Sequence, residues 1–289
     1  MESIIFSFIF FISAAAGAPS SLILVTAPLS GNASNSSLTS VEPPTAAVNV
    51  SSLLQDQRHY NETHETNAEM SEDVQQDFVT QEGDILVPTD RNAVQTLWAD
   101  AVMFYVINKD LANREADVLA AMNMISSMSC IRFKKRTNEL NYVTFTSGEG
   151  CASFVGCRGG SQPVFFSPTC SVGNICHELI HALGFHHEHT RMDRDQFIDV
   201  HWDNIQPGKE RNFEKKAGDT QNLAYDLESI MHYGKFFFAS GSRPTVEALH
   251  GGDQMGQREH LSSLDAQRLN MLYRCEERRR WQEDAVKNV

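Results

Sequence analysis

Two histidines and a glutamate near the middle of the chain give the clearest chemical signal. His177 and His181 are four residues apart, so on a helix their imidazoles lie on one face and can bind one metal ion. Glu178 flanks this face, where it can hold a water molecule beside the metal rather than bind the metal itself. Gly184 can take the left-handed conformation that ends a helix, which lets His187 turn back as a third nitrogen ligand. Three protein ligands leave a position for water, as in hydrolytic zinc sites.

The pattern continues beyond the third histidine. Residues 177–195 read HELIHALGFHHEHTRMDRD, which resembles the extended zinc signature HExxHxxGxxHExxRxDRD of the astacin family of metalloendopeptidases, a branch of the metzincins. A second stretch, SIMHY at residues 229–233, resembles the Met-turn of that family. The resemblance covers about residues 92–275 and implies one Zn²⁺ per chain. It also implies that Met231 forms an apolar floor beneath the zinc.

The resemblance and the residue types together predict peptide-bond hydrolysis by a zinc-bound water. Glu178 is expected to remove a proton from this water and to deliver it to the leaving amine. The resemblance implies that the hydroxyl of Tyr233 binds the metal or stabilises the oxyanion. For specificity, we expect Arg258 to favour an acidic residue just after the cleaved bond, since family members with a similar sequence place a basic residue there. The alternative is that Arg258 is a surface arginine.

Both helices and strands are predicted around these residues. Residues 101–107 are apolar enough for a buried strand, and apolar residues at mostly helical spacing predict a helix over residues 110–129. Strands are predicted over residues 131–136 and 142–147, a glycine-rich loop over residues 148–160, the zinc helix over residues 174–183, and a closing helix over residues 264–273. We therefore predict an α+β fold, and the resemblance implies a metzincin/astacin-like domain with a mixed β-sheet upper half and an irregular lower half.

A short strand is also predicted over residues 163–167. Pro163 at its start cannot donate to a neighbouring strand, which favours the edge of a sheet. The resemblance implies that this strand lines the cleft and pairs with an extended substrate through main-chain hydrogen bonds.

The first 18 residues read as a secretory signal peptide. An apolar run over residues 4–12 is followed by small residues up to Ala18, as at a signal cleavage site. The run is shorter than the about 20 residues that a bilayer-spanning helix needs, which disfavours a membrane anchor. No other stretch reads as a membrane span, so a secreted, extracellular protein is predicted, with storage in secretory granules as one option.

Residues 19–91 read as a pro-segment. They hold eleven acidic and two basic residues, which accounts for −9 of the net charge of −13. Such a stretch buries too little apolar surface to offset its ordering entropy, so most of it should be disordered. It carries the four Asn-x-Ser/Thr glycosylation acceptors, at Asn32, Asn35, Asn49 and Asn61. A permanent solubilising stalk is the alternative interpretation.

A latency element is predicted at residues 81–84. They read QEGD, which resembles the F-x-G-D element of the family, with Gln81 in place of phenylalanine. The resemblance implies that Asp84 binds the zinc in the proenzyme. A trypsin-like protease could cut between Arg91 and Asn92, and the resemblance then implies that the new amino terminus of Asn92 turns inward toward Glu188. We expect this ammonium to stabilise the buried Glu188 carboxylate, for which the uncut chain would offer no charge.

All six cysteines lie from residue 130 onward, inside the expected peptidase domain. In a secreted chain they point to disulfides, and sequence alone allows 15 pairings of six cysteines. The resemblance implies the pairs Cys130 with Cys275 and Cys151 with Cys170. By elimination we expect Cys157 to pair with Cys176, although two buried free thiols are the alternative.

These features predict a peptidase domain at residues 92–276 with a short tail at residues 277–289, like the single-domain, hatching-enzyme-like members. The predicted partners are protein or peptide substrates and an activating trypsin-like protease. Nucleic acid is not expected, because the basic run at residues 134–136 reads as a solvated strand end. The rival function is a catalytically silent, zinc-stabilised binding module for extracellular or egg-coat proteins, which would need neither Glu178 nor Tyr233.

Overall fold

The computed structural model describes residues 68–70, 78–87 and 96–287, all within one compact unit, residues 49–289. The expected signal peptide, the four glycosylation acceptors and the expected cleavage site between Arg91 and Asn92 lie outside the described residues. The two described pieces of the expected pro-segment are therefore residues 68–70 and 78–87.

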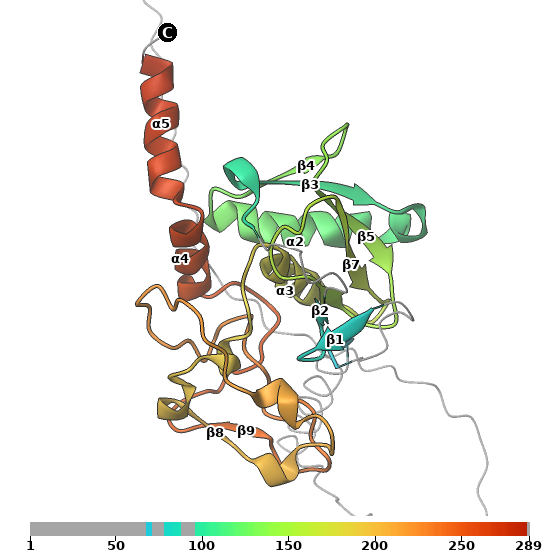
Figure 1. The fold of residues 1–289 in the computed structure, drawn as a ribbon, viewed down its shortest axis with the longest axis vertical. Coiled ribbons are helices and arrows are strands. Elements are labelled where there is room, and N and C mark those ends of the chain that lie inside the picture. The colour runs from blue at the N-terminus through green and yellow to red at the C-terminus, as the bar shows by residue number, and fades with distance from the viewer. Residues whose placement is uncertain (1–67, 71–77, 88–95, 288–289) are drawn as a thin grey trace, which may run out of the picture. The chain divides into compact units, whose positions relative to one another are not determined.

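A seven-stranded mixed sheet forms the upper half of the domain (Figure 1). Its strands, in chain order, are β1 (Val79–Gln81), β2 (Ile85–Val87), β3 (Val102–Ile107), β4 (Arg132–Lys135), β5 (Tyr142–Ser147), β6 (Ala152–Ser153) and β7 (Ser161–Phe166). Across the sheet the order is β1-β2-β6-β7-β5-β3-β4. Strands β4, β3, β5 and β7 run parallel, whereas β6 is antiparallel to β7 and β2 is parallel to β6. Two strands of the expected pro-segment therefore extend the sheet of the peptidase domain.

The prediction that the strand with Pro163 lies at the edge of the sheet is wrong. Strand β7, which carries Pro163, lies between β5 and β6, and Pro163 faces Thr144 of β5. The outer strand of the peptidase part on this side is β6, which falls inside the predicted loop. Pro163 fits in the sheet because β6 pairs only with Val164 and Phe165, so no strand of the described residues pairs with the start of β7 on that side.

Two helices pack against each other beneath the sheet, α2 (Glu115–Met128) and α3 (Val172–Ala182). The side chain of Ser171 accepts a hydrogen bond from the backbone of Asn174, and the side chain of Asn174 accepts one from the backbone of Ser171. This capping box begins α3 two residues earlier than predicted. Gly184 has φ +114° just beyond the helix, which lets the chain leave it sharply.

The lower half is irregular, as the resemblance implies. It contains short 3₁₀ turns, a two-stranded sheet of β8 (Ile198–Val200) and β9 (Val246–Ala248), and its own cluster of buried aromatic side chains. Helix α4 (Ser263–Leu272) forms where a closing helix is predicted, and α5 (Cys275–Lys287) takes up most of the expected tail. Helix α3 lies between the two halves in Figure 1, and the α+β class is confirmed.

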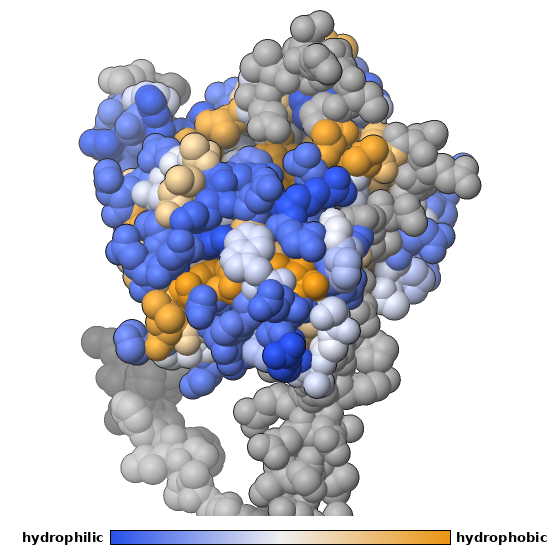
Figure 2. Space-filling view, turned by 60° about the horizontal axis from the view of Figure 1, so that its bottom comes forward, coloured by the Kyte–Doolittle hydropathy of each residue, from blue (hydrophilic) through white to orange (hydrophobic). Residues whose placement is uncertain are grey.

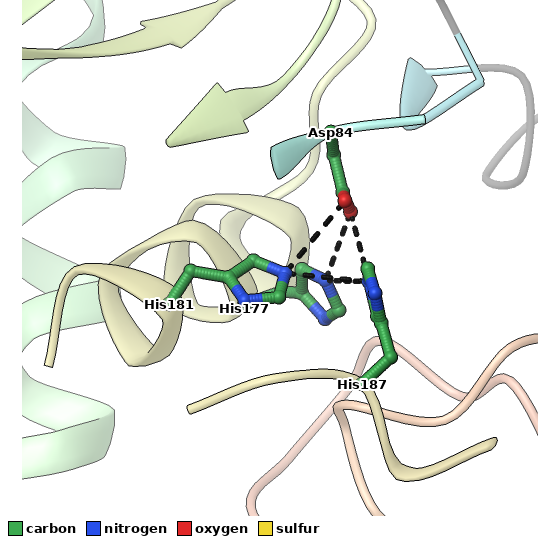
Figure 3. Close-up of side chains that lie close together, drawn as sticks. All are labelled: Asp84, His177, His181 and His187. Atoms are coloured by element: carbon green, nitrogen blue, oxygen red, sulfur yellow. Dashed lines mark hydrogen bonds and ion pairs between the residues drawn. The ribbon is translucent and has the colours of Figure 1, made fainter. Parts of the chain in front are cut away.

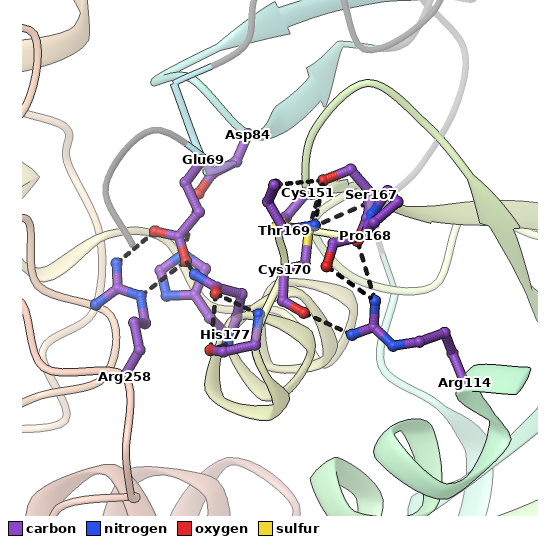
Figure 4. The surroundings of a disulfide bond; sticks show 12 residues. Glu69, Asp84, Arg114, Cys151, Ser167, Pro168, Thr169, Cys170, His177 and Arg258 are labelled. Carbon is purple, nitrogen blue, oxygen red and sulfur yellow. Dashed lines mark hydrogen bonds and ion pairs between the residues drawn. A yellow bond between two sulfur atoms is a disulfide. The ribbon is translucent and has the colours of Figure 1, made fainter. Parts of the chain in front are cut away.

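Two of the three expected disulfides are formed, Cys130 with Cys275 and Cys151 with Cys170. Figure 4 shows the second of these bonds. The third predicted disulfide, between Cys157 and Cys176, is not formed. Both residues are free, buried thiols. Gly156 donates its N–H to the carbonyl of His181, which places Cys157 near the C-terminal end of α3. Cys176 lies five residues before His181, about 7.5 Å along the helix axis, and no bond joins the two thiols.

The surface is mixed in character. On the face shown in Figure 2, hydrophobic residues form small patches separated by hydrophilic ones. Among the described residues, none of the helices combines the length and the apolar character needed to cross a bilayer.

Candidate active site

Three histidines point their Nε2 atoms toward one position beside α3. Each Nδ1 is held by an acceptor at 2.7 Å: the Ile230 carbonyl for His177, the Phe185 carbonyl for His181, and the Glu82 carboxylate for His187. An Nδ1–H that donates to an oxygen fixes the ring orientation and leaves Nε2 as a free lone pair. This arrangement prepares all three Nε2 atoms for one metal ion.

The spacing of these atoms suits zinc (Figure 3). The Nε2 of His187 lies 3.2 Å from that of His177 and 3.3 Å from that of His181. An oxygen of Asp84 lies 3.0 Å from His177 Nε2 and 3.2 Å from His187 Nε2, and its other oxygen lies 3.7 Å from His181 Nε2. Tetrahedral bonds of about 2.1 Å would separate ligand atoms by roughly 3.4 Å. The residues present therefore fit a zinc ion, with Asp84 in the fourth position.

The three histidines lower the pKa of the buried Asp84 carboxyl. Burial alone would raise the pKa of this carboxyl, but the three histidines together hold it well below its usual range. Asp84, a residue of the expected pro-segment, thus places a carboxylate beside the three histidines.

Glu178 lies beside this cluster with a fully buried carboxylate. Neither of its oxygens has a hydrogen-bond partner in the described part of the chain. Burial raises the pKa of Glu178 well above its usual range, and repulsion from Asp84 and Glu69 raises it further. A buried carboxyl without a partner costs stability, so it requires a functional explanation. A base held for a water molecule on the metal is such an explanation.

Tyr233 and Met231 belong to the turn at residues 229–233, which resembles a Met-turn. The Tyr233 hydroxyl donates to the backbone carbonyl of Glu82 at 2.6 Å, and its ring stacks between His189 and Phe237. It therefore already binds a peptide carbonyl two residues from Asp84. Met231 is buried, and its carbonyl accepts the N–H of Glu188 at 2.9 Å.

The surroundings of Glu188 differ from the prediction. Its carboxylate is paired with Arg268 at 2.6 and 2.7 Å and with Arg191 at 3.1 Å. Burial raises the pKa of Glu188, and both arginines oppose this shift. The expectation that the uncut chain offers no charge to Glu188 is wrong, because Arg191, three residues along the chain, and Arg268 of α4 both reach it. Asn92, its expected partner, lies outside the described residues.

The expected latency element, residues 81–84, is held in the structure by Glu82 rather than by residue 81. Gln81 is exposed, whereas the Glu82 carboxylate contacts both His187 and Lys216. These two partners outweigh burial and hold the pKa of Glu82 well below its usual range. The Glu82 N–H also donates to the side chain of Asn212 at 3.1 Å. A polar anchor has thus replaced the aromatic one.

Arg258 is 4 % exposed and lies next to the metal cluster, so it is not a surface arginine. It forms an ion pair with Glu69, a residue of the expected pro-segment that was not predicted to belong to the site. Glu69 is one of eleven acidic residues in residues 19–91, so nothing in its sequence context distinguishes it. Asn174, which also contacts Glu69, was not predicted as a site residue, and in the structure it also takes part in the capping box of α3.

Comparison with known proteins agrees with this geometry. The family model described as Astacin, a peptidase family, matches residues 90–274. The chain is 40% identical over 190 residues to zinc metalloproteinase nas-14 of Caenorhabditis elegans, covering 63% of this chain and 38% of that protein. It is 38% identical over 209 residues to high choriolytic enzyme 1 of Oryzias latipes, covering 67% of this chain and 77% of that protein. The chain therefore spans under two fifths of the first relative and about three quarters of the second.

The solved structure of high choriolytic enzyme 1, a hatching enzyme zinc-protease of Oryzias latipes, superposes with a TM-score of 0.60. The two chains are 34% identical, and the match covers 66% of this chain and 100% of that one. The two molecules thus share one fold over the matched part of the chain.

Proposed function

Since the chain belongs to the astacin family of zinc metallopeptidases, we propose that it is a secreted endopeptidase, made as a latent proenzyme, that cleaves extracellular proteins. One observation carries this proposal: three histidine Nε2 atoms and the Asp84 carboxylate converge on one point, next to the unpartnered Glu178. The first three ligands and Glu178 remain in any product cut after Arg91, whereas Asp84 is removed.

The chain's own residues have separate tasks in the proposed reaction. When bound, zinc supplies a Lewis acid and a water molecule of lowered pKa. Glu178 takes a proton from the attacking water and passes it to the leaving amine. The Tyr233 hydroxyl, which donates to the Glu82 carbonyl in the uncut chain, donates instead to the oxygen of the scissile carbonyl.

We propose that an extended substrate pairs with the edge of β6. In the uncut chain this edge is covered by β2, and the Ser153 N–H donates to the Asp84 carbonyl at 2.9 Å. Removal of the segment up to Arg91 frees these backbone groups. A free strand edge next to a metal site binds peptides through their main chain, largely independently of sequence.

Activation would require a trypsin-like protease that cuts after Arg91. The new ammonium of Asn92 would then approach Glu188 through the cavity of about 320 Å³ that Glu188 and Arg268 help to line. Because both arginines already pair with Glu188, this ammonium would add to an existing network rather than supply its first positive charge.

For specificity, we propose that Arg258 binds an acidic side chain just after the cleaved bond. Its guanidinium is buried beside the metal site and already holds a carboxylate, which supports this role. The rival role of a silent binding module is less well supported, because it would not require Glu178 and Tyr233 to face the metal position.

Glu178→Gln tests the proposed catalytic role. This isosteric variant should fold and bind one zinc like the wild type, but after trypsin activation its casein cleavage should fall by about 10²-fold or more. Zinc content by atomic absorption and casein turnover are the two measurements. Wild-type turnover by a zinc-loaded Glu178→Gln variant would refute the assignment.

A further inference from the structure

We propose that Glu69 is an internal substrate mimic: its carboxylate occupies, in the uncut chain, a subsite built from Arg258 and Asn174 that binds an acidic substrate side chain after activation. The inference rests on the proposed function, because it names an occupant and a second recognition residue for the Arg258 pocket.

The Glu69 carboxylate is bound by one edge of the Arg258 guanidinium, through Nε and Nη2 (Figure 4). Arg258 Nε donates to one Glu69 oxygen at 2.8 Å, and Arg258 Nη2 donates to the other at 2.6 Å. Glu69 is fully buried and Arg258 is 4 % exposed. Bidentate pairing of this kind recognises the planar carboxylate group as well as its charge. The site is therefore a carboxylate site by geometry.

Asn174 completes the site with a third donor. Its Nδ2 donates to a Glu69 oxygen at 2.5 Å, while its Oδ1 accepts from the Ser171 N–H at 2.8 Å and the Ser171 hydroxyl at 2.7 Å. The capping box of α3 thus fixes which end of the amide faces the pocket. Asn174 presents a donor to the pocket whether or not Glu69 is there.

The chain also fixes Arg258 without help from Glu69. Arg258 Nη1 donates to the carbonyls of His232 at 3.1 Å and Gln257 at 3.0 Å. A Cβ on Gly173 would lie 1.6 Å from the Arg258 carbonyl, so only glycine lets the two backbones meet. Both donors therefore belong to a site that persists when the pro-segment leaves.

The site lies next to the proposed reaction centre. Ligand atoms of Glu69, His177 and Glu178 all lie within 4.8 Å of one another. Glu69 also arrives together with Asp84, because Gly83 packs so closely on the Glu69 carbonyl that a Cβ there would lie 2.2 Å away. The pro-segment thus delivers one carboxylate to the metal position and a second to the neighbouring subsite.

The first test uses the uncut full-length chain in an Asp84→Ala background, with integrity shown by mass spectrometry. Adding Glu69→Gln, which keeps size but removes the charge, should raise residual peptidase activity by roughly tenfold or more, as expected for a lost charge-assisted pair. Hydrogen exchange of residues 68–70 should also accelerate. After trypsin activation, variants with and without Glu69→Gln should be identical, because residue 69 has been removed.

The second test uses the activated enzyme and peptides that differ only by Glu or Gln after the cleaved bond. Asn174→Asp keeps the capping oxygen but replaces the donor with a negative charge, so the ratio of kcat/KM for Glu over Gln should fall by roughly tenfold or more. Zinc content and thermal unfolding of the variant control for zinc binding and folding.

Unchanged latency with Glu69→Gln, or an unchanged Glu preference with Asn174→Asp, would overturn the inference. Neither result would affect the proposed function, provided that activated wild-type enzyme cleaves peptides. Absence of any cleavage by the activated wild type would instead refute the proposed function itself.

Discussion

At the scale of single residues, the site combines groups that the sequence places by spacing with groups that only folding brings together. The His177 and His181 pair needs one helix, so its geometry follows from a four-residue interval. Glu69 and Arg258 are 189 residues apart, and no local pattern connects them. For this reason the zinc ligands could be predicted, whereas the occupant of the Arg258 pocket could not.

Asp84→Ala should weaken latency. The Asp84 carboxylate contacts all three histidines, so its loss removes the fourth ligand group while leaving the zinc ligands intact. Uncut Asp84→Ala chain should therefore cleave casein at a measurable rate, well below that of the activated enzyme because Glu69, Glu82 and β2 still cover the cleft. A variant proven uncut by mass spectrometry and as silent as the wild-type proenzyme would exclude Asp84 as the latency ligand.

Cys157 and Cys176 should behave as unreactive thiols in the folded protein. Both are buried, and burial, reinforced by Asp265, raises the pKa of the Cys176 thiol far above its usual range. Without reductant, iodoacetamide should label neither cysteine in the native chain and both in denaturant. Mass spectrometry counts the added groups. No labelling in denaturant would show that the two thiols are bonded after all.

At the scale of elements, helices and strands were predicted correctly where the segment itself carries a local sequence pattern. Strand β5 forms as predicted because its alternating side chains suit a sheet, and α4 begins at the capping box of Ser262 and Asp265. Strand β6 has only two residues, and its partner β2 belongs to a stretch predicted to be largely disordered. Such pairing depends on contacts between distant segments, which composition does not reveal.

Gly83→Ala should loosen the docked latency element. Gly83 has φ +85°, and an added Cβ would lie 2.2 Å from the Glu69 carbonyl and 2.9 Å from Phe238. The strain should accelerate hydrogen exchange in residues 68–70 and 78–87 of the uncut chain and raise its residual activity. The activated enzyme, which lacks residue 83, serves as the matched control and should be unchanged. Equal exchange rates in wild type and variant would contradict this account of the turn.

At the scale of the whole molecule, residues 68–70 and 78–87 cover the groups that the proposed peptidase would use. Asp84 lies at the metal position, Glu82 beside His187, Glu69 in the Arg258 pocket, and β2 along the edge strand β6. In the activated enzyme, the metal position, the Arg258 pocket and the edge of β6 would instead bind substrate. Removal of one segment would therefore free the metal, the subsite and the strand edge together.

The most direct test of this account measures zinc content and casein cleavage on the same full-length preparation before and after trypsin treatment. We expect about one zinc per chain in both states, because three histidines hold it independently of Asp84, and cleavage only after trypsin. A chelator should abolish this cleavage, and added zinc should restore it. Undiminished cleavage by the zinc-depleted, trypsin-treated chain, or no cleavage by the zinc-loaded one, would contradict the central claim.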